Sequence, residues 1–330
     1  MGSVHLAGDI GGTKTSLAFI DVDSGPRVFL DKATYPSRDY PTLEAMVKLF
    51  LEGKKWIPSR ASFGVAGPVI NGQVQTTNLP WRLEEAVLSK ELNMPVRLLN
   101  DLTATASSVP FLKDADLVTL NPGKPVDHGS MAVIAPGTGL GEAYLNWDGK
   151  RYHAFPSEGG HVDFAPTNAP QIKMLTYLQA QLGHISYERV CSGMGLPNIY
   201  AFLKAEGDEA EPAWLGEQLA HEADPTPVIT QAALEGTAKI AVATLDLFTA
   251  ILAAEAGNLA LKILADGGIY LGGGIPPRIL PFMQKESFLA SFQNKGRFAS
   301  LLENIPVHVI LNTETALIGA ARQGLEAVEK

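Results

Sequence analysis

Three glycine-rich turns each follow an apolar run, and two of them lead straight into another strand-like run. The turns are residues 9–15 (DIGGTKT), 136–141 (PGTGLG) and 272–274 (GGG). Glycine lets the backbone adopt positive φ, and successive bare N–H groups form a concave nest for an anion. One such turn alone is more often a tight hairpin. Three in one chain, two with a hydroxyl beside the glycines, favour a shared phosphate ligand.

Two commoner phosphate motifs are excluded by spacing. The dinucleotide fingerprint G-x-G-x-x-G opens a helix, whereas residues 136–141 open an alternating strand. A Walker loop would need a glycine at position 7 to precede Gly12 and Lys14 correctly, and that residue is Ala7. The arrangement that remains is strand, glycine turn, strand.

Length and composition limit the class of protein. A chain of 330 residues with 46% apolar residues should form two lobes with ample cores. Its net charge of −9, without a Lys/Arg run, argues against a nucleic-acid partner. A nucleotide substrate stays compatible with this charge, because magnesium carries much of the countercharge. The single Cys191 excludes an intrachain disulfide and a cysteine-cluster zinc site, and it suits a reducing cytosol.

Neither a leader nor a membrane span is expected. A strand begins within three residues of Met1, with no cationic leader before it. The longest apolar stretch, residues 240–264, is interrupted by charged residues and predicts a buried helix. We therefore expect a cytoplasmic protein without a membrane partner.

Hydrophobic periodicity predicts an α/β chain with an internal duplication. An antiparallel meander, helices and further strands come first, and a similar series starts again about 130 residues later, at residue 131. The expected strands are residues 4–7, 16–22, 27–33, 61–66, 73–77, 96–99, 131–135, 142–145, 269–271 and 307–311. The expected helices are residues 41–52, 83–92, 171–182, 229–253 and 313–328. The acidic segment 205–227 is expected to be a surface excursion, with a helix near residues 214–221 and no chemistry.

Asn100 and Asp101 end an apolar strand and precede a helix. Asp101 could cap that helix by accepting from its free N–H groups. It could equally be a carboxylate at the carboxyl edge of a sheet that accepts a proton from a substrate hydroxyl beside a bound phosphate. The residues alone leave both alternatives open.

Three further polar side chains are candidates for a small polar ligand. Glu158 and His161 flank two glycines, which excludes the helical zinc motif and favours a tight loop that directs both side chains at one ligand. Glu188 follows Ser186, which could cap a helix, so Glu188 could also be a first-turn acid stabilised by the helix dipole. Carboxylates suit polyols because a charged acceptor takes two hydroxyl hydrogen bonds at once.

From end to end the chain resembles the bacterial glucokinase family, within the hexokinase and actin-like ATPase superfamily. The motifs that carry the resemblance are residues 9–13 (DIGGT), 99–101 (LND), 137–141 (GTGLG), 158–164 (EGGHVDF), 188–193 (ERVCSG) and 272–275 (GGGI). The resemblance implies two RNase H-like lobes with mixed sheets flanked by helices and an active site in the cleft between them. It places residues 1–111 and 313–330 in a small lobe and residues 112–312 in a large lobe.

The resemblance also implies roles for individual residues. Asp101 would be the base acting on the 6-hydroxyl of glucose. Further sugar contacts would come from Asn78, Asn100, Gly137, Glu158, His161 and Glu188. ATP would contact Asp9, Gly11, Gly12, Thr13, Lys14, Gly137, Thr138 and Gly139 through its phosphates, and Gly272, Gly273 and Gly274 near its adenosine. Mg²⁺ would be held mainly by ATP, near Asp9, without a protein metal cluster, and a homodimer is expected from the family alone.

Three other functions are alternatives to sugar phosphorylation by a glucokinase. A kinase for a related hexose or amino sugar would use the same residues. A sugar-sensing repressor of this fold would need a helix-turn-helix before the first strand, where only three residues precede Val4. An ATPase that works on a protein partner would leave Glu158, His161 and Glu188 unexplained as a set.

Overall fold

The computed structural model describes residues 3–76 and 79–326, and the chain divides into two compact units. The first unit consists of Met1–Asp114, Leu145–Pro156 and Asn312–Lys330, and the second of Ala115–Tyr144 and Ser157–Leu311. The lobe boundaries predicted from the sequence stay a prediction. They leave Leu145–Pro156 in the large lobe, whereas this hairpin segment is grouped here with the first unit.

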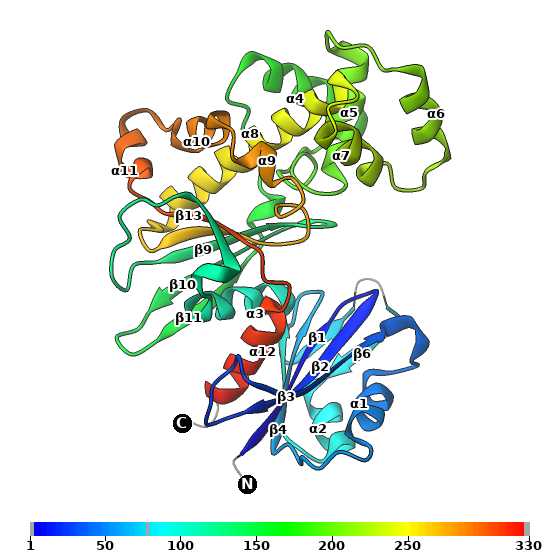
Figure 1. Cartoon of the computed structure of the whole chain (residues 1–330), viewed down its shortest axis with the longest axis vertical. Coiled ribbons are helices and arrows are strands. Elements are labelled where there is room, and N and C mark those ends of the chain that lie inside the picture. Colours follow the sequence, from blue (N-terminus) through cyan, green and yellow to red (C-terminus); the bar gives the residue numbers. More distant parts are fainter. Residues whose placement is uncertain (1–2, 77–78, 327–330) are drawn as a thin grey trace. The chain divides into compact units, whose positions relative to one another are not determined.

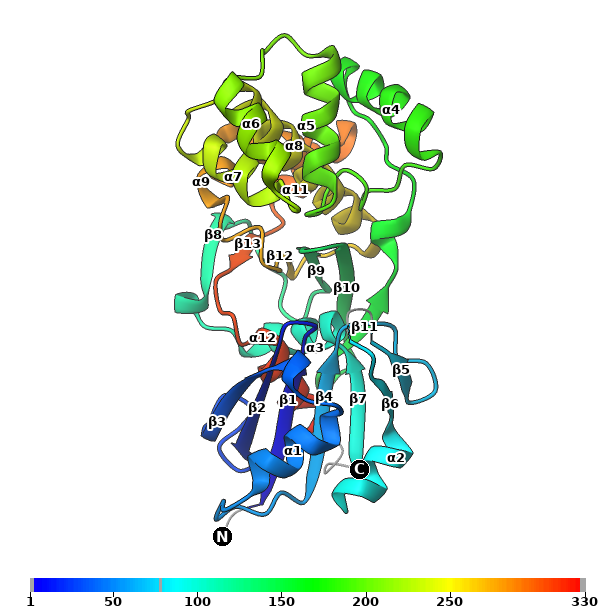
Figure 2. The ribbon, with the colours of Figure 1, turned by 90° about the vertical axis from the view of Figure 1, so that its right-hand side faces the viewer.

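A five-stranded mixed sheet forms the centre of the first unit (Figure 1), and its strand order is β3-β2-β1-β4-β7 (Figure 2). The first three strands form the predicted antiparallel meander, and β4 pairs parallel with both β1 and β7. A separate antiparallel pair, β5-β6, lies outside this sheet. The strands are β1 (Val4–Ile10), β2 (Lys14–Asp21), β3 (Phe29–Pro36), β4 (Arg60–Val65), β5 (Gln73–Gln75), β6 (Arg82–Glu84) and β7 (Val96–Asn100).

Alternate residues of these strands face two helical layers, as the two-residue period of a strand requires. Leu6 of β1 packs in a cluster with side chains of α1 (Leu43–Leu51) and α2 (Glu85–Leu92). Its neighbour Ala7 packs on the other face, in a cluster with α12 (Thr315–Glu326). Figure 2 shows α1 in front of this sheet and α12 behind it. The sheet is therefore buried on both faces.

The second unit repeats the strand order of the first, which confirms the predicted duplication. Its strands belong to a six-stranded sheet, in which the end of β10 and nearly all of β11 lie in the segment Leu145–Pro156 that is grouped with the first unit. The strand order is β11-β10-β9-β12-β13-β8, and β12 pairs parallel with both β9 and β13. Apart from the added edge strand β8, this matches the first sheet strand for strand. The strands are β8 (Leu117–Asn121), β9 (Met131–Pro136), β10 (Leu140–Trp147), β11 (Tyr152–Ser157), β12 (Gly268–Leu271) and β13 (Val307–Ile310).

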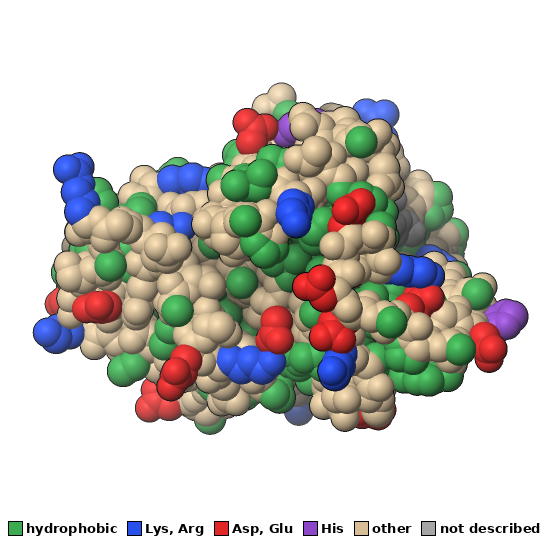
Figure 3. Space-filling view, turned by 90° about the horizontal axis from the view of Figure 1, so that it is seen from above, with side chains coloured by type: hydrophobic (Ala, Val, Ile, Leu, Met, Phe, Trp, Pro, Cys, Tyr) green, Lys and Arg blue, Asp and Glu red, His purple; other side chains and the backbone are tan. Residues whose placement is uncertain are grey.

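Eight α-helices are described in the second unit, and the longest, α8 (Lys239–Ile263), is its core helix. Among the described residues α8 is the one helix long and apolar enough to cross a membrane, and 72% of its apolar window is buried inside the fold. This confirms the predicted buried helix. The others are α4 (Ala169–Leu182), α5 (Gly195–Glu206), α6 (Ala213–His221), α7 (Thr226–Leu234), α9 (Leu280–Met283), α10 (Glu286–Gln293) and α11 (Ala299–Glu303). On the face drawn in Figure 3, acidic and basic side chains are interspersed.

Two predicted helices differ from the structure. The stretch 229–253, expected to be one helix, belongs to α7 and α8, because the chain turns at Gly236 with φ +66°. Residues 186–190, expected to start a helix capped by Ser186, form a turn instead. Ser186 pairs with Asp163 in an isolated β-bridge, so long-range pairing overrides the local capping signal there. The helix expected near residues 214–221 is confirmed, and it is α6.

The helices α12 and α3 (Asp101–Ser108) approach so closely that a glycine is required between them. A Cβ on Gly319 of α12 would overlap the carbonyl oxygen of Ala104 in α3. Gly319→Ala should therefore destabilise the protein by about 1–3 kcal/mol, the usual effect of overpacking, although alanine is the better helix former. Thermal unfolding measures the change.

The matched control for this prediction is Gly216→Ala in α6. A Cβ on Gly216 would meet the Glu211 carboxylate, a side-chain group that pairs with Lys204 and accepts from Tyr200, rather than backbone. A shift of this side chain can relieve the contact, so we expect this variant to lose less stability than Gly319→Ala. Equal stability of Gly319→Ala and the wild type would contradict the close packing of α3 and α12.

Candidate functional site

The second glycine turn is the link between β9 and β10, and it is held by backbone hydrogen bonds from distant segments. Within the turn, the Gly137 N–H donates to the Gly139 carbonyl at 2.8 Å. From outside, the Gly193 N–H donates to the Gly137 carbonyl at 2.8 Å, and the Ile275 N–H donates to the Pro136 carbonyl at 3.3 Å. Segments that lie far apart in sequence therefore meet at this turn.

The third glycine run lies directly against the second turn. Gly273 has φ +82°, and a Cβ there would come within 2.5 Å of the Pro136 carbonyl oxygen, so this position requires glycine for its backbone angle and for the close approach. Gly272 donates its N–H to the Ile134 carbonyl at 2.9 Å. A Cβ on Gly274 would meet no atom within 4 Å, so this glycine borders open space.

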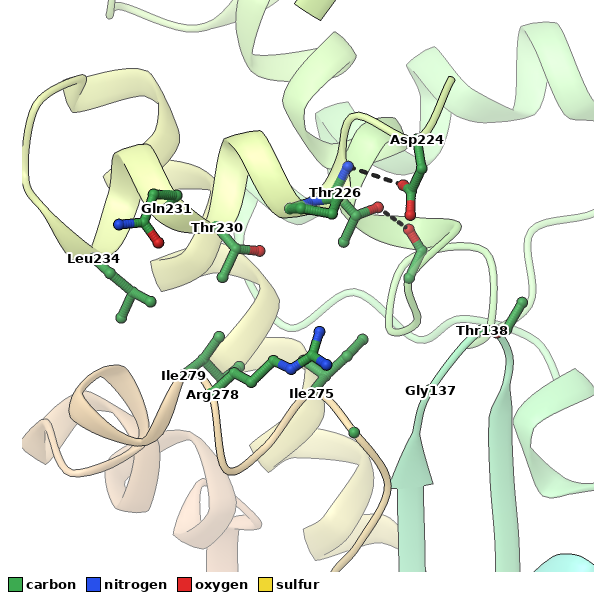
Figure 4. Close-up of a pocket in the computed structure, with 13 residues that line it drawn as sticks. Gly137, Thr138, Asp224, Thr226, Thr230, Gln231, Leu234, Ile275, Arg278 and Ile279 are labelled. Carbon is green, nitrogen blue, oxygen red and sulfur yellow. Dashed lines mark hydrogen bonds between the residues drawn. The ribbon is translucent and has the colours of Figure 1, made fainter. Parts of the chain in front are cut away.

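That open space is a pocket of about 700 Å³ within the second unit. It is lined by glycines of both turns, Gly137 and Gly274, and by Thr138. Figure 4 shows side chains of α7 on one side of the pocket and Arg278, from the segment after the third glycine run, extending into it. A pocket of this size, bordered by glycine backbone at one end, has room for a nucleotide.

Sequence reasoning missed most of the side chains that line this pocket. Asp224 and Thr226 belong to the acidic segment to which no chemistry was assigned, yet both line the pocket. The Thr226 hydroxyl donates to the Gly193 carbonyl at 2.8 Å, and the Thr226 N–H donates to Asp224 Oδ1 at 3.0 Å (Figure 4). No local pattern marks such residues, because the fold of α7 against the glycine turns brings them there.

Glu158, His161 and Glu188 are brought together in the same unit. The His161 ring lies 3.8 Å from Glu188 Oε1 through Nδ1 and 3.9 Å from Glu158 Oε2 through Nε2. The Glu188 N–H donates to the Gly160 carbonyl at 2.8 Å, which ties this residue to the 158–161 loop. The side chains of Glu158 and His161 are well exposed, at 82% and 59%, so both are available to a ligand.

Glu188 also supports the second glycine turn. The sequence pattern predicts this residue in the first turn of a helix and does not predict this contact. Its Oε2 accepts from the Leu140 N–H at 3.0 Å, and a Cβ on Gly139 would overlap that oxygen. The carboxylate is therefore partly buried beside the turn, with 17% of the side chain exposed. One residue links the loop of candidate sugar ligands to the turn that lines the pocket.

In the first unit, Asp9 and Asp101 lie near enough to influence each other's charge. Burial, followed by the Asp101 carboxylate, raises the pKa of Asp9 to about 6, while Lys14 acts in the opposite direction. Burial likewise raises the pKa of Asp101, against hydrogen bonds from the Leu102 N–H and from Asn100 that lower it. Two carboxyl groups with raised pKa at strand ends are typical of a catalytic site.

Asn100 is the residue that caps α3. Its Oδ1 accepts from the N–H groups of Leu102 and Thr103 at 3.0 and 3.1 Å. Its amide nitrogen donates to the Gly67 carbonyl at 3.2 Å and to Asp101 Oδ1 at 3.0 Å. Asp101 is thus the first residue of the helix, and Asn100 orients its carboxylate.

The first glycine turn, between β1 and β2, is held by Ser37. The Ser37 hydroxyl donates to the Gly11 carbonyl at 2.7 Å, and its N–H donates to the Thr13 carbonyl at 3.0 Å. The Gly11 N–H donates to the Lys14 carbonyl at 3.0 Å. Gly12 is half-buried, and Thr13 and Lys14 are exposed, so the turn can receive a ligand. Ser37 was not predicted, because it acts from another strand end.

Two other expectations concern the predicted sugar contact of Asn78 and the binding of a metal ion. Asn78, a predicted sugar contact, lies outside the described residues. Within residues 3–76 and 79–326, no group of three or more His, Cys, Asp or Glu side chains is arranged to hold a metal ion.

Beneath the 158–161 loop lies a buried acid, Glu142 of β10. Its side chain is 1% exposed, and its Oε1 has no hydrogen-bond partner among the described residues. Burial, followed by the charge of Glu255, raises the pKa of Glu142 to about 7. A Cβ on Gly159 would overlap Glu142 Oε2, so glycine in the loop makes room for this carboxyl group.

Glu142 should make stability fall as the pH rises. Its folded pKa of about 7 is above its ordinary value of 4.5, so the folded state holds the proton more tightly. Stability is therefore full below the unfolded pKa and is lost as the pH rises through the folded value. Between about pH 5 and pH 8 the wild type should lose on the order of 1–3 kcal/mol of its free energy of unfolding. Glu142→Gln keeps the shape of the side chain but cannot ionise, so this variant should not show that loss.

Urea unfolding of both proteins across this range measures the difference. The control is Glu217→Gln on α6, which removes the same charge from an exposed position and should give no pH-dependent gain. If Glu142→Gln and the wild type lose stability equally as the pH rises, Glu142 does not hold the proton.

Comparison with known proteins gives a consistent result. The family model for glucokinase matches residues 6–326. A glucokinase of Trichormus variabilis is 44% identical over 333 residues, which cover 96% of this chain and 97% of that protein. A crystal structure of glucokinase from an Antarctic psychrotroph aligns with a TM-score of 0.87 at 30% identity, over 98% of this chain and 99% of the other.

A likeness of fold extends to more distant proteins. A ROK family glucokinase from Streptomyces griseus, solved in complex with glucose and AMPPNP, aligns with a TM-score of 0.62 at 21% identity. The alignment covers 97% of this chain and 99% of that one.

Proposed function

Because the chain belongs to the glucokinase family, we propose that it transfers the γ-phosphoryl group of ATP to the 6-hydroxyl of glucose. The products are glucose 6-phosphate and ADP. The match to the Trichormus variabilis glucokinase covers nearly the whole length of both proteins. The region matched by the family model includes every candidate site residue described above.

Asp101 carries the catalytic assignment. It is a partly buried carboxylate at the end of β7, its pKa is raised by burial, and Asn100 orients it. In the proposed step, Asp101 accepts the proton of the 6-hydroxyl while that oxygen forms a bond to the γ-phosphorus. The bond between the γ-phosphorus and the bridging oxygen breaks, and ADP leaves.

The sugar is assigned to Glu158, His161 and Glu188, with Asn100. Glu158 and Glu188 both lie close to His161, which supports this assignment. Each carboxylate can accept two hydroxyl hydrogen bonds, and the imidazole adds another. The sugar contacts of Asn78 and Gly137 stay predictions.

ATP is assigned to the glycine turns. The pocket beside Gly137, Thr138 and Gly274 suits the adenosine and the phosphates nearest to it. The turn at Gly11–Lys14 supplies further amides and a cation for the terminal phosphates. Five further residues of the three glycine turns do not line the pocket, and their contacts with ATP stay predictions: Gly12, Thr13, Gly139, Gly272 and Gly273.

Mg²⁺ fits the chemistry of Asp9, whose carboxyl group is buried and has a raised pKa. A divalent cation near it would favour the charged form, and the ion would neutralise developing charge on the phosphates. We further propose that the two lobes, divided as the sequence predicts, close over the substrates and exclude water from the γ-phosphate. A cytoplasmic location agrees with the use of ATP, and a homodimer stays a prediction.

Asp101→Ala should lower kcat by about 10²–10⁴, the usual contribution of a positioned general base, with little change in the KM for ATP. ADP release measured with a panel of hexoses and amino sugars tests both the base and the substrate. The control is Asp39→Ala, which removes an exposed acid of the same unit.

Turnover of Asp101→Ala near the wild-type rate would remove this residue from the mechanism. ADP release that does not depend on a sugar would overturn the kinase assignment. If another hexose is phosphorylated faster than glucose, that hexose replaces glucose as the assigned substrate.

Gly274→Val should raise the KM for ATP roughly tenfold or more, because a tenfold change needs only about 1.4 kcal/mol. A Cβ at position 274 meets no atom within 4 Å in the protein alone, so the valine side chain would start in open space beside the proposed adenosine pocket. The KM for glucose and the unfolding temperature should change little.

Gly273→Val is the matched comparison, and it should lower the unfolding temperature because φ and the Pro136 carbonyl both require glycine. An unchanged KM for ATP in Gly274→Val would show that the nucleotide lies elsewhere.

A further inference from the structure

A second cavity lies in the first unit and shares no residue with the proposed glucose and ATP sites. Its volume is about 200 Å³. Three basic and three aromatic side chains line it: Lys150, Arg151, Arg322, Phe111, Trp147 and Tyr152. They come from the β10-β11 hairpin, from α12 and from the short turn after α3.

The charge of this cavity is opposite to that of the chain. The chain has a net charge of −9, yet three cations and no acid line the cavity. The nearest acid in the hairpin, Asp148, is engaged by the hairpin itself. Its Oδ1 accepts from the N–H groups of Lys150 and Arg151 at 2.8 and 2.9 Å, and its Oδ2 lies 2.7 Å from His153 Nε2. The cavity therefore favours an anion.

The aromatic walls favour an anion with a carbon skeleton. Trp147 and Tyr152 meet edge to face, with ring centroids 5.1 Å apart. The Arg322 guanidinium lies over the Phe111 ring, 5.4 Å from its centroid, which restricts the direction in which it can donate. Ring faces pack against carbon skeletons, and a rigid guanidinium fork matches phosphate oxygens.

Size limits the ligand further. A volume of about 200 Å³ equals that of roughly six or seven water molecules in the liquid. This accommodates a phosphate group on a short carbon skeleton. We propose that this cavity is a binding site for a small organic phosphate, in addition to the proposed kinase site.

The cavity is joined by continuous elements to the proposed catalytic residues. The helix α3 begins at Asp101, and Ser107 near its end lines the cavity. The strand β10 follows the second glycine turn and ends at Trp147, in the cavity wall. A bound ligand would contact the distal end of α3, whose first residue is the proposed base Asp101, and the distal end of β10, which directly follows the second glycine turn.

Isothermal titration calorimetry of the full chain with glycerol 3-phosphate tests this site. We expect binding at millimolar concentration or below, weaker binding of inorganic phosphate and sulfate, and none of glycerol. Lys150→Ala and Arg322→Ala should each weaken binding of glycerol 3-phosphate about tenfold or more, as expected for loss of a charged hydrogen-bond donor. Lys150 is exposed on the hairpin, so its variant tests the site even if Arg322→Ala unfolds.

Two control variants separate this site from others. Lys90→Ala removes an exposed cation of α2 that does not line the cavity, and it should bind normally. Lys14→Ala alters the proposed ATP turn and should also bind normally. Loss of binding in Lys14→Ala but not in Lys150→Ala, equal binding of sulfate, or no binding by the wild type would each overturn the proposal.

Discussion

Close approach of backbone to backbone at the end of β9 is the constraint on which the pocket of the second unit depends. The carbonyls of Pro136 and Gly137 accept hydrogen bonds from Ile275 and Gly193, which belong to segments far away in the chain. This approach leaves no room for a Cβ at Gly273. The glycines thus serve two purposes. Some, such as Gly273, allow the chain to pack, whereas Gly274 leaves space that a ligand can fill.

Burial of acids is the second common feature of the candidate sites. Asp9, Asp101 and Glu142 all have a raised pKa, and burial is the first cause in each case. A weakly solvated carboxylate takes up a proton more readily near neutral pH, which suits a general base. Glu142 shows the same effect outside the proposed reaction, because this group lies against Gly159 of the 158–161 loop and none of the proposed steps uses it.

Local sequence patterns predicted most strands and the glycine turns, because period-two hydrophobicity and glycine are local signals, but they did not predict β6, β8 or β11. They failed where a distant partner decided the outcome. Ser186 has the appearance of a helix cap, but its pairing with Asp163 and the hydrogen bond from Glu188 to Gly160 form a turn. The motifs shared with a known family identified the candidate sugar and phosphate residues. They gave no sign of Thr226 or Arg278, which reach the pocket only through packing.

By itself, the sequence determined the duplicated α/β pattern, the positions of the three glycine turns and the residue types available for phosphate and polyol chemistry. Periodicity and glycine content impose these directly on the backbone. Only the tertiary structure decided that Glu188 supports the second turn, that Asn100 rather than Asp101 caps α3, and that α7 forms one side of the pocket. The physical reason is that each of these depends on hydrogen bonds or packing between residues whose separation in the sequence carries no information about their distance in space.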